Sequence, residues 1–206
     1  AIRQGVNYFD TAWPYHSGKS EPVIGKILQN YPRESFYLAD KFPGHQIAPT
    51  YDVADIFERQ LKKCSVEYFD FYLMHSQNKE IFEKFRACNA YETAFALKEE
   101  GKVRHVGLSF HDRAEVLDEI LTAYPQVEVV QIQLNYVDFE DAAIQSRLCY
   151  EVCRKHGKPI IVMEPVKGGT LVNLPEDAHA VLEGLHGGSP ASYAIRFAAG
   201  FDGIFM

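Results

Sequence analysis

The chain has 206 residues, of which 47% are hydrophobic and 24% are charged, and its formal net charge is −7. This length and composition are typical of one globular domain. No apolar run approaches the roughly 20 residues that a membrane-spanning helix needs, and no signal peptide is visible, so we expect a cytoplasmic protein. An acidic chain without a basic cluster does not favour nucleic acid or an anionic membrane as a partner.

The four cysteines, Cys64, Cys88, Cys149 and Cys153, are scattered, and no two have a Cys-x-x-Cys spacing. Neither a zinc ribbon nor a disulfide framework is therefore indicated. Cys149 and Cys153 could share a helix face near His156, but cysteine is also a common buried small hydrophobe. Since the histidines lack a metal-ligand spacing such as His-Glu-x-x-His, we predict no metal site.

Apolar runs and helical stripes alternate along the first half of the chain. Gly5 is expected to cap a helical turn before a first strand at 6–9. Ser20 is expected to cap a helix with Val23, Ile24, Ile27 and Leu28 on one face. A second strand at 36–42 precedes a helix whose stripe consists of Val53, Ile56, Phe57, Leu61 and Cys64. A third strand covers 69–75.

The same alternation continues in the second half. We predict a helix near 91–98, a fourth strand at 103–110, and a helix marked by Val116, Leu117, Ile120, Leu121 and Tyr124. A fifth strand at 127–134 precedes a helix with Ile144, Leu148 and Val152 inward, and a sixth strand covers 159–163. Ser189 and Pro190 begin a helix that stops at Gly200, and 202–206 begins a seventh strand.

The spacing of these strands predicts an incomplete (β/α)8 TIM barrel of the α/β class, with a single domain over residues 1–206. An eightfold barrel uses about 250 residues, or roughly 31 for each strand and helix, which fits the observed rhythm. A doubly wound open sheet is the competing architecture, but it would normally carry a Gly-x-Gly-x-x-Gly fingerprint, which the sequence lacks. The chain does not begin with methionine, and we expect its first strand to be missing and its last strand to be cut short.

Polar residues stand where three predicted strands end. Asp10 ends the first strand and Tyr15 follows in the next loop, while Lys41 and His75 end the second and third strands. Because active sites of α/β folds form at the carboxyl ends of parallel strands, we expect these four side chains to meet. Asp10, Tyr15 or His75 alone could have a capping or packing role. Lys41 must be paired or functional, because an unpaired buried ammonium is costly.

These residue types suit the protonation of a carbonyl oxygen. A tyrosine hydroxyl, with a pKa of about 10, donates poorly at neutral pH unless a nearby cation favours the phenolate. Lys41 would be that cation, and Asp10 would keep it charged and oriented. His75 would polarise or position the carbonyl oxygen. The hydride must come from a bound cofactor, because no side chain supplies one.

The motif Phe9-Asp10-Thr11-Ala12-x-x-Tyr15, with Ser20-Glu21 and Gly25 after it, resembles the aldo/keto reductase family. Lys41 in Leu38-Ala39-Asp40-Lys41 and His75 in Tyr72-Leu73-Met74-His75 resemble the remaining catalytic positions of that family. Ser109 in Val106-Gly107-Leu108-Ser109 and Gln131 are similar to the residues that hold the nicotinamide amide. The resemblance covers essentially the whole chain. It implies a (β/α)8 barrel that reduces a small carbonyl substrate with NADPH, or less often NADH.

Two stretches depart from the common pattern of the family. Phe110 stands where many members have asparagine, and Met163-Glu164-Pro165-Val166-Lys167 stands where an aromatic residue, a serine and a proline are common. We expect Met163, Glu164, Pro165, Val166 and Lys167 to lie at the cofactor, with Met163 against the nicotinamide. The choice between NADPH and NADH stays open. Trp13 and His16 flank Tyr15, and we expect them to line the substrate mouth.

The segment Met163–Gly169 also resembles the corresponding segment of a bacterial and archaeal subgroup of the family. The longer members of this subgroup carry a ferredoxin-like iron–sulfur domain. No such cysteine cluster occurs in this chain, so we predict no iron–sulfur site here. The resemblance implies such a domain only for a longer parent chain.

Two other functions remain open at this point. The first is a barrel that binds nucleotide and reports redox state to a partner with little turnover, which retention of all four polar residues disfavours. The second is a metal-dependent barrel hydrolase that uses Asp10, His75 and Glu164.

Overall fold

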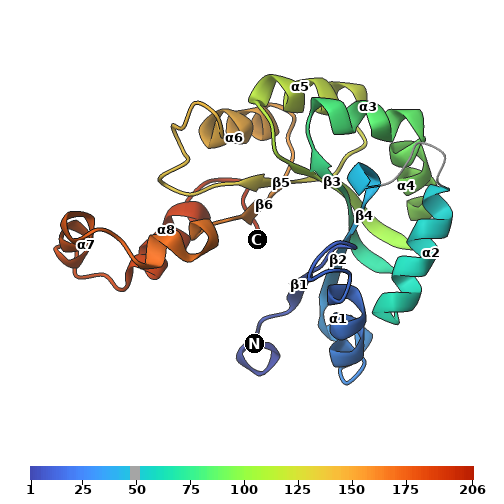
Figure 1. Cartoon of the computed structure of the whole chain (residues 1–206), viewed down its shortest axis with the longest axis horizontal. Coiled ribbons are helices and arrows are strands. Elements are labelled where there is room, and N and C mark those ends of the chain that lie inside the picture. The colour runs from blue at the N-terminus through green and yellow to red at the C-terminus, as the bar shows by residue number, and fades with distance from the viewer. Residues whose placement is uncertain (47–51) are drawn as a thin grey trace. The chain divides into compact units, whose positions relative to one another are not determined.

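The computed structural model of the protein describes residues 1–46 and 52–206. Its contacts divide the chain into two compact units. Unit 1 consists of Ala1–Ser109 and Gln126–Glu128, and unit 2 consists of Phe110–Pro125 and Val129–Met206 (Figure 1). No helix in the described part of the chain is long and apolar enough to cross a membrane.

Unit 1 contains a sheet whose strands lie in the order β1-β2-β3-β4. The strands are β1 (Tyr8–Asp10), β2 (Tyr37–Phe42), β3 (Phe69–Gln77) and β4 (Val103–Phe110), which runs into unit 2 at its last residue. β1 pairs with β2 and β2 pairs with β3 in parallel, with Asp10 opposite Ala39 and Lys41 opposite Leu73. The carboxyl ends of these strands therefore lie at one edge of the sheet.

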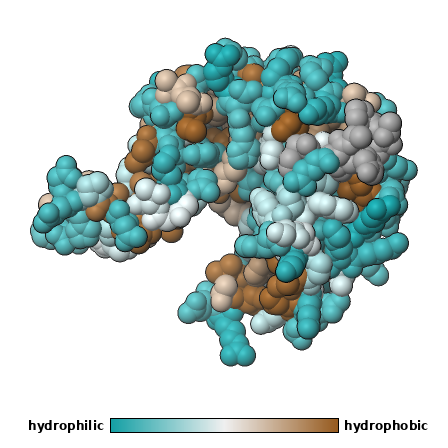
Figure 2. All heavy atoms as spheres, viewed as in Figure 1, coloured by the Kyte–Doolittle hydropathy of each residue, from teal (hydrophilic) through white to brown (hydrophobic). Residues whose placement is uncertain are grey.

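In the described residues of unit 1, α-helices follow the strands, and α1, α2 and α4 cover one face of the sheet (Figure 1). They are α1 (Ser20–Leu28), α2 (Val53–Cys64), α3 (Lys79–Ala87) and α4 (Ala90–Glu99), with short 3-10 helices η1 (Ile2–Gln4), η2 (Arg33–Ser35) and η3 (Gly44–Gln46). Figure 2 shows apolar side chains exposed beside the N-terminal segment, where Val6 is 48% exposed.

Unit 2 repeats the alternation of strands and helices. Its elements are α5 (Ala114–Ala123), β5 (Val129–Gln133), α6 (Ser146–Lys155), β6 (Ile160–Met163), η4 (Lys167–Val172), α7 (Glu176–Glu183) and α8 (Pro190–Ala199). β5 and β6 pair in parallel, from Val130 opposite Ile160 to Gln133 opposite Met163. The prediction of an α/β fold is thus confirmed.

Several predicted elements are confirmed with their physical cause. The whole predicted stripe of α2 is buried, and the Asp52 side chain caps this helix by accepting hydrogen bonds from the Ala54 and Asp55 amides at 2.9 and 3.3 Å. The Ser189 hydroxyl caps α8 by accepting the Ser192 amide at 3.3 Å, as its sequence predicts. Strand β4 has the predicted bounds.

The predicted cap of α1 is wrong, and its predicted apolar face is confirmed only in part, since Leu28 is buried at 2% exposure. Ser20 is the first helical residue, and its hydroxyl accepts a hydrogen bond from the Thr11 hydroxyl at 2.8 Å instead of capping the helix. Val23 and Ile27 are 53% and 51% exposed, whereas Glu21 and Gly25 are buried. The reason is that α1 packs on α2 through Gly25, where the absence of a side chain permits a close approach of the two helices.

Other predictions in unit 2 and at the loops are wrong or are confirmed only in part. Leu148 of α6 is 38% exposed, and Cys149 and Cys153 form its buried face. The predicted start of a seventh strand is confirmed in part: Ile204 forms an isolated parallel bridge with Ile160, and the Phe205 amide donates to the Ile160 carbonyl at 3.2 Å. The helices α3 and α7 were not predicted, because both lie in segments whose polar residues resemble loops.

A buried carboxylate anchors the amino ends of three strands of unit 1. Asp70 of β3 is 1% exposed and accepts hydrogen bonds from the Leu38 amide at 2.9 Å and from Arg33 at 2.6 Å. Arg104 of β4 lies 3.2 Å from its other oxygen. The Arg33 guanidinium also stacks 3.8 Å from the centre of the Tyr68 ring. The charge of Asp70 is therefore shared between two arginines.

Gly25→Ala should destabilise the protein, because a Cβ atom there would lie 2.5 Å from the Cys64 carbonyl oxygen of α2. We expect the free energy of unfolding, measured by urea titration, to fall by about 1–3 kcal/mol. Gly184→Ala is the matched control, since its Cβ would lie 3.4 Å from the Val181 carbonyl oxygen. The control should change stability by less than about 0.5 kcal/mol. Equal effects of the two changes would contradict the close packing of α1 on α2.

The cysteine thiols should react slowly in the folded protein. Burial raises the pKa of Cys149 to about 12, and it also raises the pKa values of Cys64 and Cys153. At pH 8 a thiol with such a pKa is ionised in about one molecule in 10,000. We expect iodoacetamide, followed by mass spectrometry, to label the half-buried Cys88 first and the other three only after unfolding. Rapid labelling of Cys149 at pH 8 would contradict the burial of its thiol.

Candidate active site

The loop after β1 is held by backbone hydrogen bonds, within itself and to β2, and it carries Tyr15. The Thr11 amide donates to the Ala39 carbonyl at 3.0 Å, which extends the β1–β2 pairing by one residue. The Tyr15 amide donates to the Ala12 carbonyl, and the Tyr15 carbonyl accepts the Ser20 amide. His16 lies between them at φ 52°, a left-handed conformation that closes the turn. The Tyr15 side chain is consequently 37% exposed.

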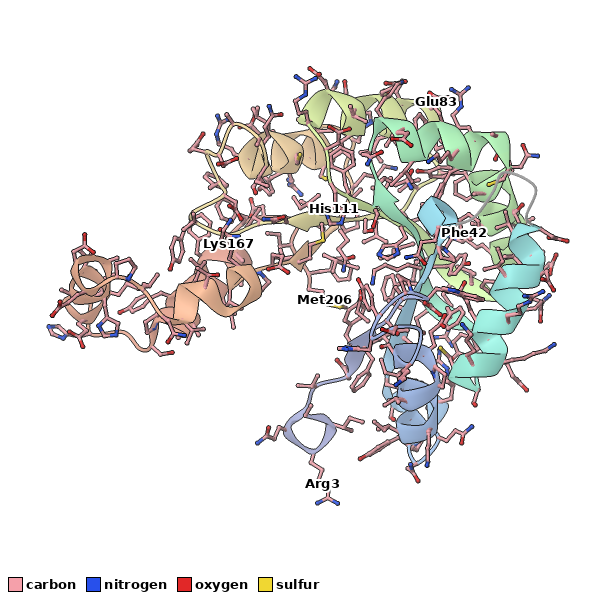
Figure 3. All side chains as sticks on the ribbon, in the orientation of Figure 1. Arg3, Phe42, Glu83, His111, Lys167 and Met206 are labelled. Atoms are coloured by element: carbon pink, nitrogen blue, oxygen red, sulfur yellow. The ribbon has the colours of Figure 1, made fainter. Side chains whose placement is uncertain are left out.

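The Lys41 ammonium is buried at the end of β2, one residue before Phe42, which Figure 3 labels. Its side chain is 1% exposed, and it forms an ion pair with the Asp10 carboxylate. It also donates a hydrogen bond to the Thr11 carbonyl at 3.0 Å. The predicted partner of Lys41 is therefore present, and burial strengthens the pair because little water screens it.

The second oxygen of Asp10 accepts a hydrogen bond from the Tyr8 hydroxyl at 3.2 Å. Burial, and then the negative charge of Asp10, raise the pKa of Tyr8 well above its usual value. Tyr8 thus keeps its proton and acts as a donor. The carboxylate is held on both sides, which fixes the direction in which it meets Lys41.

Tyr15 and His75 lie beside this ion pair. The Lys41 ammonium nitrogen is 4.7 Å from the centre of the Tyr15 ring. The rings of Tyr15 and His75 are 5.7 Å apart between centres and meet at 76°, edge to face. His75 is 5% exposed, so its ring forms the buried wall against which the more exposed Tyr15 packs. The structure brings Asp10, Tyr15, Lys41 and His75 together at one strand edge of unit 1.

The backbone turns sharply after His75. Ser76 has φ 55°, and its amide donates to the Ser109 hydroxyl at 2.8 Å. Ser109 is 1% exposed at the end of β4. A hydroxyl that accepts one hydrogen bond still has its own hydrogen to donate. Ser109 therefore supports the turn after His75, and it can also donate to an amide oxygen.

A separate acidic group lies on the other side of β2. Asp40 is buried, and burial together with the negative charge of Glu21 raises its pKa well above the usual range. Glu21 pairs with Lys63 at 2.7 Å. Since side chains alternate across a strand, Asp40 points away from the Lys41 ammonium. Asp10 is therefore the carboxylate that supplies the charge.

Trp13 and His16, the two residues predicted to line the substrate mouth, differ from each other in their surroundings. The Lys63 ammonium lies 3.2 Å from the centre of the Trp13 ring, so Trp13 packs against the ion pair between Lys63 and Glu21. His16 is exposed at the tip of the loop. Their contact with a substrate stays a prediction.

The remaining predicted residues belong to unit 2. Gln131 is 6% exposed on β5, and Met163 ends β6. Glu164 is exposed, and Pro165 and Val166 lead to Lys167 at the start of η4. Gly168 and Gly169 follow at φ 60° and 95°, conformations that glycine adopts without strain. The loop therefore presents backbone groups without bulky side chains at those two positions.

Lys167 has a partner within the same unit. Its ammonium pairs with Asp138, which is 2% exposed and also accepts hydrogen bonds from Gln133 and Asn135 at 2.6 Å each. Burial acts to raise the pKa of Asp138, but these three donors hold it below the usual value. The carboxylate is thus ionised, and it fixes the start of η4 to the loop after β5.

Sequence reasoning missed several residues that hold the site. Tyr8 holds Asp10 from a strand, and the Thr11 carbonyl holds Lys41 from a loop. Nothing in the local sequence indicates either contact. Gln60 did give one, because it lies inside the apolar stripe of α2 and is fully buried. A polar residue in such a stripe indicates a specific hydrogen-bond partner. Within the described ranges, no group of three or more His, Cys, Asp or Glu side chains is placed to hold a metal ion.

Comparison with known proteins gives consistent matches. The protein named "Probable aldo-keto reductase 1" of Glycine max is 30% identical over 185 residues, which cover 82% of this chain and 48% of that protein. The NADH-specific methylglyoxal reductase of Escherichia coli is 28% identical over 188 residues, which cover 83% of this chain and 56% of the relative. The chain thus spans about half the length of these curated relatives.

Solved structures share the fold. The aldo-keto reductase of Klebsiella pneumoniae in complex with NADPH superimposes with a TM-score of 0.70 at 20% identity. The match covers 98% of this chain and 69% of that structure. Residues 1–200 match the sequence model of the aldo/keto reductase family. The chain therefore belongs to the aldo/keto reductase family.

Proposed function

We propose that the protein reduces an aldehyde or ketone, with NADPH or NADH as the source of hydride. The observation that carries this proposal is the cluster of Asp10, Tyr15, Lys41 and His75 in unit 1. The names of the relatives support both nucleotides, since one is an NADH-specific reductase and one solved structure contains NADPH. A (β/α)8 barrel, a cytoplasmic location and a small carbonyl substrate are part of the proposal.

In this proposal, Tyr15 donates a proton to the oxygen of the carbonyl group. The Lys41 ammonium favours the negative charge that develops on the phenol oxygen as the proton leaves. Asp10 keeps the ammonium in place, and Tyr8 in turn holds Asp10. The buried His75 ring orients the carbonyl oxygen toward Tyr15. Positioning matters because the proton can pass only over hydrogen-bond distance.

A nicotinamide bound here would supply the hydride, and the residues present fit such a cofactor. The Ser109 hydroxyl and the Gln131 amide carry the donors and acceptors that a nicotinamide amide requires. We propose that Met163, Glu164, Pro165, Val166 and Lys167 contact the nucleotide. The two glycines after Lys167 support this role, because their positive φ angles leave the backbone accessible to a phosphate.

Tyr15→Phe should strongly lower turnover and preserve nucleotide binding. Loss of a general acid typically lowers the rate by about 100- to 10,000-fold. The measurement is the oxidation of NADPH, followed by absorbance, with a panel of aldehydes and quinones. Tyr37→Phe is the matched control, since it removes an exposed hydroxyl of the same unit. Wild-type protein that binds NADPH tightly without turnover would favour a redox-sensing role instead.

Gln131→Leu should weaken nucleotide binding. Leucine would leave the nicotinamide amide without the hydrogen-bond partner that Gln131 supplies. A buried polar group left unpaired typically costs about 1–3 kcal/mol, so we expect the Kd for NADPH to rise by about 5- to 150-fold. Nicotinamide fluorescence measures this without any substrate, and NADH in parallel shows which nucleotide is preferred. Gln145→Leu, at the start of α6, serves as a control outside the proposed contacts. Unchanged binding in Gln131→Leu would remove this residue from the nucleotide site.

A further inference from the structure

The backbone carbonyl of Lys41 is held by a buried pair of side chains. The side-chain amide of Gln60 donates to the Lys41 carbonyl at 2.9 Å. The oxygen of the same amide accepts a hydrogen bond from the Tyr72 hydroxyl at 2.6 Å. Gln60 comes from α2 and Tyr72 from β3, so two neighbouring elements fix the end of β2 at its functional residue.

His75 has the same arrangement. The side-chain amide of Gln77 donates to the His75 carbonyl at 3.1 Å. The oxygen of Gln77 accepts a hydrogen bond from the Tyr91 hydroxyl at 2.9 Å. Tyr91 comes from α4, so this pair ties the end of β3 to the helix behind it. Two different glutamine–tyrosine pairs therefore hold the backbones of two residues of the proposed active site.

The chemistry of these contacts fixes their direction. A backbone carbonyl can only accept, so each glutamine must turn its NH₂ group toward it and its oxygen toward the tyrosine. Burial raises the pKa of Tyr72 well above its usual value, so its hydroxyl remains a donor. Gln60 uses its NH₂ group for Glu21 as well, at 3.1 Å. An amide flip would place two acceptors face to face.

All four side chains are fully buried, at 0% exposure. Buried polar groups are expensive unless they are paired, so apolar residues would fill these positions at lower cost if packing alone mattered. Both pairs instead converge on the carbonyl of a residue that must be placed accurately. A displacement of about 1 Å in a reacting group can lower a rate by about 100-fold.

We propose that Gln60 with Tyr72, and Gln77 with Tyr91, are positioning residues that hold Lys41 and His75 in register for catalysis. This inference rests on the proposed reductase function. The two pairs do not touch the substrate. They act through the backbone of the residues that do.

The test compares Gln60→Leu, Gln77→Leu, Tyr72→Phe and Tyr91→Phe with wild type. For both leucine variants we expect kcat to fall by about 10- to 100-fold, with the Kd for NADPH unchanged within about twofold. The phenylalanine variants keep the shape of the core, and they should lower kcat by smaller factors than the leucine variants. Ile56→Val, in the buried face of α2, is the control for lost packing, and it should lower the melting temperature but leave kcat unchanged.

The comparison of kcat with the Kd for NADPH separates positioning from stability. A substitution that only loosens the core should lower the melting temperature, as expected for Ile56→Val, without lowering kcat. Variants that lower the melting temperature like Ile56→Val and leave kcat unchanged would overturn the proposal.

A readout without turnover distinguishes failure of the positioning role from failure of the reductase function. The ¹³C resonance of the Tyr15 ring carbon that bears the hydroxyl, assigned with Tyr15→Phe, reports the surroundings of the phenol, because the Lys41 ammonium lies 4.7 Å from the ring centre. At neutral pH its chemical shift should change in Gln60→Leu and Tyr72→Phe and stay as in wild type in Ile56→Val. An inactive wild-type protein would refute only the reductase function, whereas an unchanged chemical shift in Gln60→Leu and Tyr72→Phe would refute the role of Gln60 and Tyr72.

Discussion

The buried ion pair between Lys41 and Asp10 is the constraint on which the active end of unit 1 depends. An ammonium that is 1% exposed is tolerated only with a nearby negative charge and further hydrogen-bond acceptors. Asp10 supplies the charge, and the Thr11 carbonyl accepts a second hydrogen bond. Because Asp10 and Lys41 come from neighbouring parallel strands, the pair can form only while β1 and β2 keep their register.

The sequence allowed the main features of the fold and site to be predicted. Asp10, Lys41 and His75 each follow a short apolar run, and parallel strands bring such positions to one edge. The supporting residues were harder to predict, because their partners are distant in sequence. Gln60 is 19 residues from the carbonyl that it holds, and only its place in an apolar stripe indicated a special role.

The errors in the predicted elements have similar causes. Ser20 suits an N-cap by local preference, but the Thr11 hydroxyl engages it across the loop. Leu148 has the higher hydrophobicity, yet Cys149 and Cys153 are the residues that α6 buries. In each case a tertiary contact, which a local pattern cannot contain, overrides the local preference.

The cluster of Asp70, Arg33 and Arg104 affects how a protein of this fold can change in evolution. It ties β2, β3 and β4 at their amino ends, whereas Tyr15, Lys41 and His75 lie at the opposite ends of their strands or just beyond them. The ion pairs that stabilise the sheet and the side chains proposed for the reaction therefore lie at opposite ends of its strands. Loops beside the proposed reacting groups can acquire new lengths and side chains, so specificity can change while the scaffold persists.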